Sequence, residues 1–203
     1  MAYMNQIKTV CVYCGSGPGT NPRFVEAAQA LGKIFAENNI RLVYGGGSVG
    51  LMGELADAVL DRGGKVIGVI PTFLKKREHA NPRGEVIVTR DMHERKQRMF
   101  DEADAFVALP GGVGTLEELV EQLTWAQLGR HRKPILLANV GGFWDPLITV
   151  FEHLRSSSFL PGGRQLAYIA VDAVEKILPA AAAALAQVEE RDLQGEPERV
   201  RRL

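Results

Sequence analysis

The sequence predicts an α/β protein built on a doubly wound, mostly parallel sheet of about seven strands, with helices on both faces. Short apolar runs alternate along the chain with amphipathic segments, as expected when helices cover both faces of a parallel sheet. Glycine-rich turns follow two of these runs and lead into helical segments. With 203 residues, 46% hydrophobic and 24% charged, the chain has the size and composition of one soluble core.

Seven apolar runs account for the expected strands, and their short length suits strands that are buried on both faces. They are Thr9 to Tyr13, Arg41 to Tyr44, Val66 to Ile70, Val86 to Thr89, Ala105 to Leu109, Ile135 to Ala138 and Leu166 to Ala170.

Six helices are expected between and after these strands, several of them starting at a proline or a glycine-rich turn. They begin near Pro22, Leu51, Met92, Thr115, Phe143 and Asp172. The alternation gives one Rossmann-like domain over residues 1–186 and a charged C-terminal tail over residues 187–203.

The connection after the third expected strand does not resemble a helix or a strand. The segment Pro71 to Gly84, PTFLKKREHANPRG, lacks apolar periodicity and contains two prolines. We expect a loop over the edge of the sheet, and such a loop can act as a lid.

Charge and cysteine usage exclude several classes of function. Lys plus Arg and Asp plus Glu both number 24, so no global field favours nucleic acid or an anionic membrane. The N-terminus has no signal-peptide core, and KILPAAAAALAQV is too short to span a membrane, so we expect a cytoplasmic protein. Cys11 and Cys14 should lie on opposite faces of a strand as packed thiols, the alternative being a redox C-x-x-C motif.

The first glycine loop lies in RLVYGGGSVGLMGE, where Gly45, Gly47 and Gly50 have the spacing G-x-G-x-x-G. A dinucleotide site also needs an acidic residue at the end of the next strand, and VIGVIPTF offers none. No Walker loop occurs anywhere in the chain.

The second glycine loop lies in ALPGGVGTLEELVEQ, between a strand and a helix. At the carboxyl edge of a parallel sheet, such glycines let backbone N–H groups approach an oxyanion beside a helix N-terminus. Gly111, Gly112 and Gly114 therefore indicate a phosphate cradle, with the Thr115 hydroxyl as an extra donor, and residues 1–186 are interpreted as a nucleotide-binding domain. The alternative is that both sets of glycines serve only tight turns.

Charged residues near these loops are candidates for chemistry. Glu117 and Glu118 point about 100° apart on a helix, so only one can face the cleft, and either could instead be a helix-capping residue. Arg95 and Lys96 lie in the first turns of a helix, where the helix dipole disfavours cations, and could contact a phosphate. The alternative is a solvated basic face paired with acidic neighbours, namely Asp91, Glu94 and Asp101.

With GGGSVGLMGE, MHERK, PGGVGTLEE and TWAQLG in this order, the chain resembles the LONELY GUY (LOG) family of cytokinin-activating phosphoribohydrolases, long mislabelled lysine decarboxylases. The resemblance runs from about Cys11 to Ala170. It implies Arg95 and Glu118 as catalytic residues, the latter as the last position of P-G-G-x-G-T-x-x-E. The candidate substrate contacts are Gly46, Gly47, Ser48, Glu78, Lys96, Gly111, Gly112, Val113, Gly114, Thr115, Leu116, Glu117 and Thr124. Glu78 is the weaker match, since KKREHANPRGEV differs in length and composition from the loop of plant members.

The resemblance implies hydrolysis of the N-glycosidic bond of N6-substituted adenosine 5′-monophosphates, and of AMP in many members, giving free base and ribose 5-phosphate. It also implies a homodimer. No metal or other cofactor is expected, and the four histidines show no metal-ligand spacing. Lys96 is the only lysine in a candidate site, and beside Arg95 it suits an anion contact better than a pyridoxal phosphate imine. Two alternatives stay open, a non-catalytic nucleotide sensor and a salvage hydrolase that prefers AMP.

Overall fold

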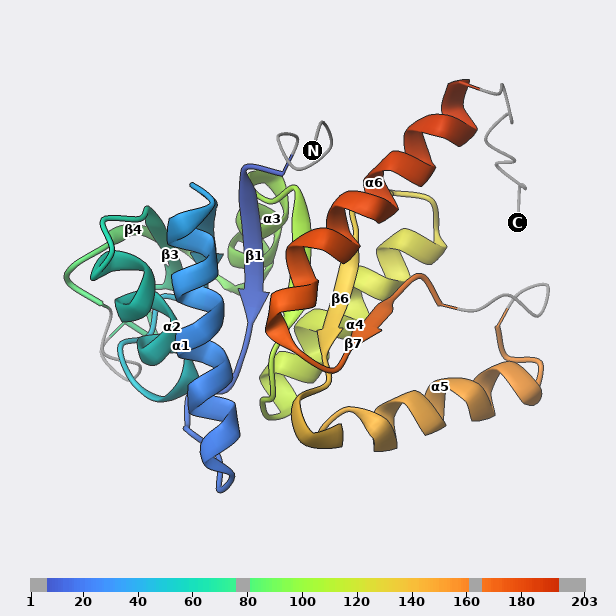
Figure 1. Ribbon diagram of the computed structural model, residues 1–203, viewed down its shortest axis with the longest axis horizontal. Helices are drawn as coiled ribbons and strands as arrows, with labels where there is room; N and C mark the ends of the chain where they lie inside the picture. Colours follow the sequence, from blue (N-terminus) through green and yellow to red (C-terminus); the bar gives the residue numbers. More distant parts are fainter. Residues whose placement is uncertain (1–6, 76–80, 161–165, 194–203) are drawn as a thin grey trace.

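The computed structural model describes residues 7–75, 81–160 and 166–193. Seven strands form one sheet in the order β4-β3-β2-β1-β5-β6-β7, and every neighbouring pair is parallel (Figure 1). The strands are β1 (Thr9–Tyr13), β2 (Arg41–Tyr44), β3 (Val66–Pro71), β4 (Glu85–Thr89), β5 (Ala105–Ala108), β6 (Ile135–Ala138) and β7 (Ile169–Val171). The predicted α/β class and the seven strands are confirmed.

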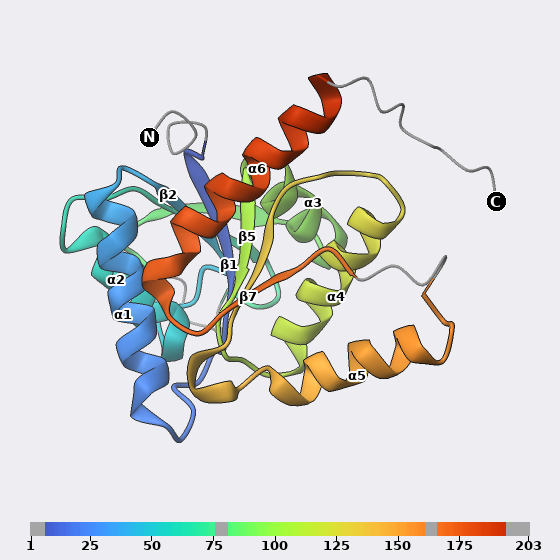
Figure 2. The ribbon, with the colours of Figure 1, turned by 45° about the vertical axis from the view of Figure 1, so that its right-hand side comes forward.

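Helices cover both faces of the sheet. They are α1 (Pro22–Glu37), α2 (Gly50–Leu60), α3 (Met92–Glu102), α4 (Val113–Gln127), α5 (Asp145–Ser156) and α6 (Ile177–Leu193), with short 3₁₀ turns η2 (Val140–Gly142) and η4 (Val174–Lys176). The apolar sides of α1, α2 and α6 pack into one buried cluster, and those of α3, α4 and α5 pack into the other. Figure 2 separates α1 and α2 on one side of the strands from α3 and α4 on the other.

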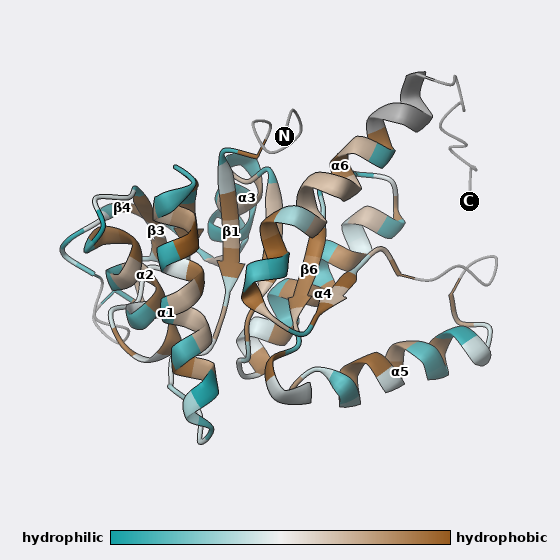
Figure 3. Ribbon diagram, in the orientation of Figure 1, coloured by the Kyte–Doolittle hydropathy of each residue, from teal (hydrophilic) through white to brown (hydrophobic). Residues whose placement is uncertain are grey.

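The hydrophobic core is two layers divided by the sheet. Figure 3 shows strands β1 and β6 largely hydrophobic, whereas α1 and α5 alternate between hydrophobic and hydrophilic residues. Cys11 belongs to one cluster and Cys14 to the other, and both are buried free thiols, as predicted for packed cysteines. No helix in the described part of the chain is long and apolar enough to cross a membrane.

Some predicted boundaries are wrong for local reasons. The seventh strand was expected at Leu166 to Ala170, but pairing with β6 begins at Ile169, because Leu166 and Tyr168 turn to pack against the α5 side of the core. The helix expected near Phe143 begins at Asp145, since Gly141 and Gly142 have φ of 61° and 75° and form a separate turn.

Three other helix starts also differ from expectation. Helix α4 begins two residues before Thr115, since the Leu116 N–H already donates to the Gly112 carbonyl. The expected start near Asp172 becomes the η4 turn, and α6 follows from Ile177. Helix α2 begins at Gly50, one residue before the expected Leu51. Helix α6 continues to Leu193, beyond the start of the predicted tail.

The sheet topology determines where a ligand can lie. The chain order reverses between β1 and β5, which are neighbours in the sheet. At such a switch point, the connections after the two strands run to opposite faces and leave a crevice at the carboxyl edge. Both glycine loops lie at that edge, one after β2 and one after β5.

Candidate functional site

Three loops meet at the carboxyl edge of the sheet. The loop after β1 is linked to the loop after β5 by the Gly15 N–H, which donates to the Pro110 carbonyl at 3.0 Å. It is also linked to the start of α2, where the N–H groups of Leu51 and Met52 donate to the carbonyls of Gly17 and Gly15, each at 3.4 Å. The two predicted glycine loops therefore form one site, with the β1 loop between them.

Some glycines in these loops are needed for the fold. Gly50 has φ of 62°, and a Cβ at this residue would collide with the Ser16 carbonyl. At Gly111 a Cβ would collide with the side chain of Thr115. For these positions the tight-turn explanation is sufficient.

Gly112 and Gly114 are different, because neither has a positive φ and no atom lies within 4 Å of a Cβ built at either residue. Turn geometry and packing would both tolerate a side chain there. Glycine at these two positions leaves open space in front of the first turn of α4. The N-cap residue Gly112 has no side chain to satisfy the first N–H groups of the helix, so this end can receive an anion.

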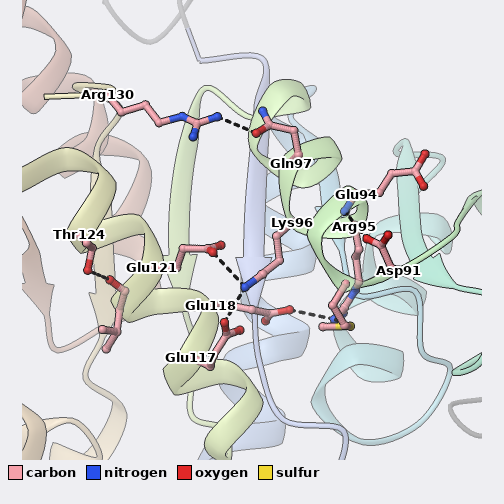
Figure 4. A network of polar contacts seen from close by, with 12 residues as sticks. Asp91, Glu94, Arg95, Lys96, Gln97, Glu117, Glu118, Glu121, Thr124 and Arg130 are labelled. Carbon is pink, nitrogen blue, oxygen red and sulfur yellow. Dashed lines mark hydrogen bonds and ion pairs between the residues drawn. The ribbon is translucent and has the colours of Figure 1, made fainter. Parts of the chain in front are cut away.

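The central feature of the site is a buried ion pair between α3 and α4. Arg95 Nη1 lies 3.0 Å from Glu118 Oε1, and the two side chains are only 8% and 9% exposed. Arg95 Nε also donates to the Val69 carbonyl at the end of β3, at 3.0 Å, which fixes the plane of the guanidinium. A Cβ at Gly45 would meet Arg95 Nη2, so the β2 loop closes over the pair. The structure thus distinguishes the two glutamates between which the sequence left the choice open. Glu118 is buried and pairs with Arg95, whereas Glu117 is exposed and pairs with Lys96 (Figure 4).

The neighbouring cation makes a second set of ion pairs. Lys96 Nζ lies 2.6 Å from Glu117 Oε1 and 2.9 Å from Glu121 Oε1, and its side chain is 11% exposed. Burial lowers the pKa of Lys96, but the two carboxylates outweigh it and hold the pKa above its usual value. A lysine kept protonated in this way is a poor nucleophile for an imine.

The alternative of a solvated basic face is wrong. Arg95 and Lys96 are directed at α4, whereas the acidic neighbours on their own segment have other partners. Asp91 accepts the N–H of Glu94 as the helix cap, and Glu94 pairs with Arg90. Asp101 accepts from the Gln97 side chain.

The remaining predicted substrate contacts lie on several elements and differ in burial. Gly46 and Gly47 are buried in the β2 loop, where Gly46 packs against Gly68 and Ile70, and Ser48 is half-buried. Val113 is exposed, Leu116 half-buried and Thr115 buried in the first turn of α4. Thr124 lies further along α4, and its hydroxyl donates to the Val120 carbonyl of its own helix. Glu78 lies outside the described residues.

Sequence analysis missed two parts of this site. The loop after β1, CGSGPG, follows a strand and precedes a helix as the other two loops do, but none of its residues was among the candidate site residues. Glu121 was not singled out, although it is four residues after Glu117 and therefore on the same helix face. Among the described residues, no three His, Cys, Asp or Glu side chains gather as they would around a metal ion.

Comparison with known proteins places this geometry in a family. Residues 52–181 match the family model described as "Possible lysine decarboxylase". A cytokinin riboside 5′-monophosphate phosphoribohydrolase of Arabidopsis thaliana is 49% identical over 175 residues, covering 85% of this chain and 81% of that protein. The chain belongs to the LOG family.

The chain is 52% identical over 157 residues to the rice LOG protein (Oryza sativa subsp. japonica), a cytokinin riboside 5′-monophosphate phosphoribohydrolase. That match covers 77% of this chain and 65% of the length of the rice protein. The segments MHERK and PGGVGTLEE supply the buried pair, Arg95 and Glu118.

Solved structures support the fold alone. The Moco carrier protein from Chlamydomonas reinhardtii superposes with a TM-score of 0.67 at 22% identity, covering 89% of this chain and 99% of that one. The molybdenum cofactor binding protein from Rippkaea orientalis gives a TM-score of 0.65 at the same identity, covering 88% of this chain and 98% of that one.

Proposed function

We propose that this protein is a phosphoribohydrolase that cleaves the N-glycosidic bond of N6-substituted adenosine 5′-monophosphates and of AMP. The products are the free base and ribose 5-phosphate. The observation that carries the proposal is the buried Arg95–Glu118 ion pair beside the open N-terminus of α4. The names of the LOG relatives support the same reaction.

The substrate phosphate binds at the first turn of α4. Gly112 and Gly114 leave room for the phosphate oxygens, and the backbone N–H groups of this turn supply hydrogen bonds and a favourable helix dipole. The site offers one anion cradle of this kind after β5, which suits a monophosphate. No metal or organic cofactor is part of the proposal.

Glu118 supplies the chemistry at the ribose. As the bond between C1′ and the base nitrogen breaks, its electron pair leaves with the base, and positive charge develops on the ribosyl group. A carboxylate in a site with little water stabilises that charge and accepts a proton from the attacking water, whose oxygen bonds to C1′. The departing base takes up a proton.

Arg95 holds that carboxylate in place. Its guanidinium is fixed by the Val69 carbonyl and so presents Nη1 to Glu118 in one orientation. The guanidinium also places a positive charge beside the Glu118 carboxylate.

A homodimer and a cytoplasmic location belong to the same proposal. Exposed apolar side chains on α4 and at its C-cap, among them Val120 and Leu128, leave a surface that a second copy can cover. Two buried, unpaired cysteines suit a reducing compartment.

The test is product analysis with AMP and with N6-isopentenyl-AMP. We expect the free base and ribose 5-phosphate from both, and the ratio of the two kcat/KM values shows which base is preferred. Glu118→Gln should lower kcat by about a hundredfold or more. The matched control is Glu102→Gln, which alters a second ion-paired glutamate at the other end of α3.

Because Glu118→Gln leaves a buried arginine without its partner, circular dichroism must show that the variant is folded. Binding of either nucleotide by calorimetry, without release of base over hours, would replace the proposal by a nucleotide sensor.

A further inference from the structure

The chain enters β4 through a turn that begins at a buried asparagine. Asn81 precedes Pro82, and an asparagine before a proline favours a turn because its side chain can accept a backbone N–H two residues on. Asn81 Oδ1 accepts from the Arg83 N–H at 3.0 Å, and Asn81 is only 3% exposed. An amide buried to this extent also needs acceptors for its own N–H groups.

The side-chain nitrogen of Asn81 bonds to α2. Asn81 Nδ2 donates to Asp57 Oδ1 at 3.3 Å, and the Arg83 guanidinium bridges Asp57 and Asp61 of the same helix, at 3.0 and 2.6 Å. The side chains of Arg83, Asp57 and Asp61 are exposed, and exposed ion pairs contribute little to stability. The buried amide is therefore the stronger link to α2, since its loss would leave buried polar atoms without partners.

Asn81 also contacts the β2 loop on both sides of Gly45. Its backbone N–H donates to the Gly46 carbonyl at 3.0 Å. On the other side, burial raises the pKa of the Tyr44 hydroxyl, and a hydrogen bond with the Asn81 side chain opposes that rise. Gly45 thus lies between two residues that Asn81 holds.

Gly45 in turn lies against the guanidinium of Arg95. A Cβ at Gly45 would meet Arg95 Nη2, so the backbone of this glycine occupies the side of the guanidinium that the other contacts leave open. Arg95 Nε is bonded to the Val69 carbonyl, and Arg95 Nη1 is paired with Glu118. A shift of the β2 loop would let the guanidinium turn and would change the orientation of the Glu118 carboxylate.

We propose that Asn81 is a positioning residue of the active site, which ties the β2 loop to α2 and so keeps Gly45 against Arg95. Its effect on the reaction passes through Gly45 and Arg95. The kinetic part of this inference rests on the proposed function, whereas the anchoring of the β2 loop is measured without turnover.

The test compares Asn81→Leu with Asn38→Leu. Leucine has nearly the shape of asparagine and makes none of its side-chain hydrogen bonds. Asn38 is a matched control, because its amide also donates to a single oxygen, the Ile34 carbonyl at 2.8 Å, but it does so at the end of α1, at the amino edge of the sheet. A third protein combines Asn81→Asp with Asp57→Asn, which exchanges the two side chains and again sets one amide against one carboxylate.

We expect Asn81→Leu to lower kcat about tenfold with KM changed by no more than about threefold, because misplaced catalytic groups cost rate more than binding. Asn38→Leu should change either constant by no more than about twofold. The exchanged pair should recover most of the lost kcat, since it restores the contact between the two positions. Hydrogen exchange in the β2 loop should be faster in Asn81→Leu than in the wild type, and unchanged in Asn38→Leu.

Three results would overturn the inference. Equal losses of kcat in Asn81→Leu and Asn38→Leu would leave Asn81 with a role in stability alone. An unchanged kcat in Asn81→Leu, with or without a rise in KM, would show that Asn81 does not act through Arg95. An exchanged pair no more active than Asn81→Leu would show that the bond to Asp57 does not carry the effect.

Circular dichroism must show that each variant is folded, and Asn81→Ser takes the place of Asn81→Leu if the latter does not fold. If the wild type releases no base from any nucleotide, the proposed function has failed. Hydrogen exchange alone then shows whether Asn81 anchors the β2 loop.

Discussion

At the scale of single residues, burial decides which of several similar side chains can do chemistry. Glu117, Glu118 and Glu121 lie within five consecutive residues of one helix, yet only Glu118 is buried against a guanidinium. The same burial acts on nearby groups, since burial, with a contribution from the charge of Glu118, raises the pKa of Cys11 and of Tyr13. The Cys11 thiol and the Tyr13 hydroxyl therefore stay neutral.

Gln122 gives a prediction about stability. Its side chain is fully buried in α4, and neither Oε1 nor Nε2 has a hydrogen-bond partner among the described residues. Replacing an unsatisfied buried amide by an apolar side chain of similar length removes a desolvation cost, so Gln122→Met should stabilise the protein by about 1–3 kcal/mol. Urea denaturation measures this, with the exposed Gln29→Met as a control that should change little. A loss of stability in Gln122→Met would contradict the prediction.

His131 gives a prediction about pH. Burial lowers its pKa, helped by the charges of Lys133 and Arg130 and opposed by the Gln122 carbonyl. The folded pKa lies below the unfolded value of about 6.5, so the unfolded chain takes up a proton first as the pH falls. The stability due to neutral His131 is thus full above about pH 6.5 and is lost as the pH falls toward the folded pKa.

Unfolding free energies at pH 7.5 and 5.5 measure this effect. The wild type should lose stability over the interval, and His131→Asn should lose less. Protonation would also break the bond from the Lys133 N–H to His131 Nδ1. Identical losses of unfolding free energy in the wild type and His131→Asn would show that protonation of His131 does not cause the loss.

At the scale of elements, glycines have two opposite roles. On α1, a Cβ at Gly32 would lie 2.7 Å from both the Ala58 Cβ and the Leu55 carbonyl of α2, so the absence of a side chain allows the two helices to pack closely. On α4, the absence of a side chain at Gly114 leaves open space. The first role serves the fold and the second serves a ligand.

Gly114→Ala tests that distinction. Alanine fits the space and favours a helix, so stability should stay level or rise by up to about 1 kcal/mol, while KM for the ribotide should rise. Gly32→Ala is the contrasting control, expected to lower stability by about 1–3 kcal/mol through overpacking. Thermal melts and steady-state kinetics give both numbers. An unchanged KM in Gly114→Ala would show that the substrate phosphate does not bind at this position.

The elements and the candidate site were predictable from the sequence to different extents. Period and composition predicted all seven strands, because buried parallel strands are short apolar runs. Boundaries failed where a local turn intervened, as at Gly141 and Gly142 before α5. The choice of Glu118 over Glu117 rested on family resemblance, because residue spacing alone cannot show which face of α4 meets Arg95. Glu121 was missed because its ion pair with Lys96 depends on how α3 and α4 pack, which residue spacing does not show.

At the scale of the whole molecule, the apolar surface of α4 predicts self-association. Leu128 is 67% exposed at the C-terminal end of this helix, and Val120 is exposed on it. Sedimentation at micromolar concentration should show a dimer for the wild type.

Leu128→Glu should shift that equilibrium toward monomer, because it places a charge in a surface that must lose water. Val88→Glu, on the edge strand β4, is the control and should sediment as the wild type does. A wild type that sediments only as a monomer would contradict the dimer.

Arg95 connects the two halves of the molecule. Its guanidinium bonds to Val69 at the end of β3, in the four-strand half of the sheet, and to Glu118 on the helix that follows β5, in the three-strand half. Catalytic activity therefore depends on the packing of the two halves of the sheet against each other. In a gradual denaturant titration, activity should vanish while most of the helical signal remains, so an assay of turnover senses the first loosening of the fold.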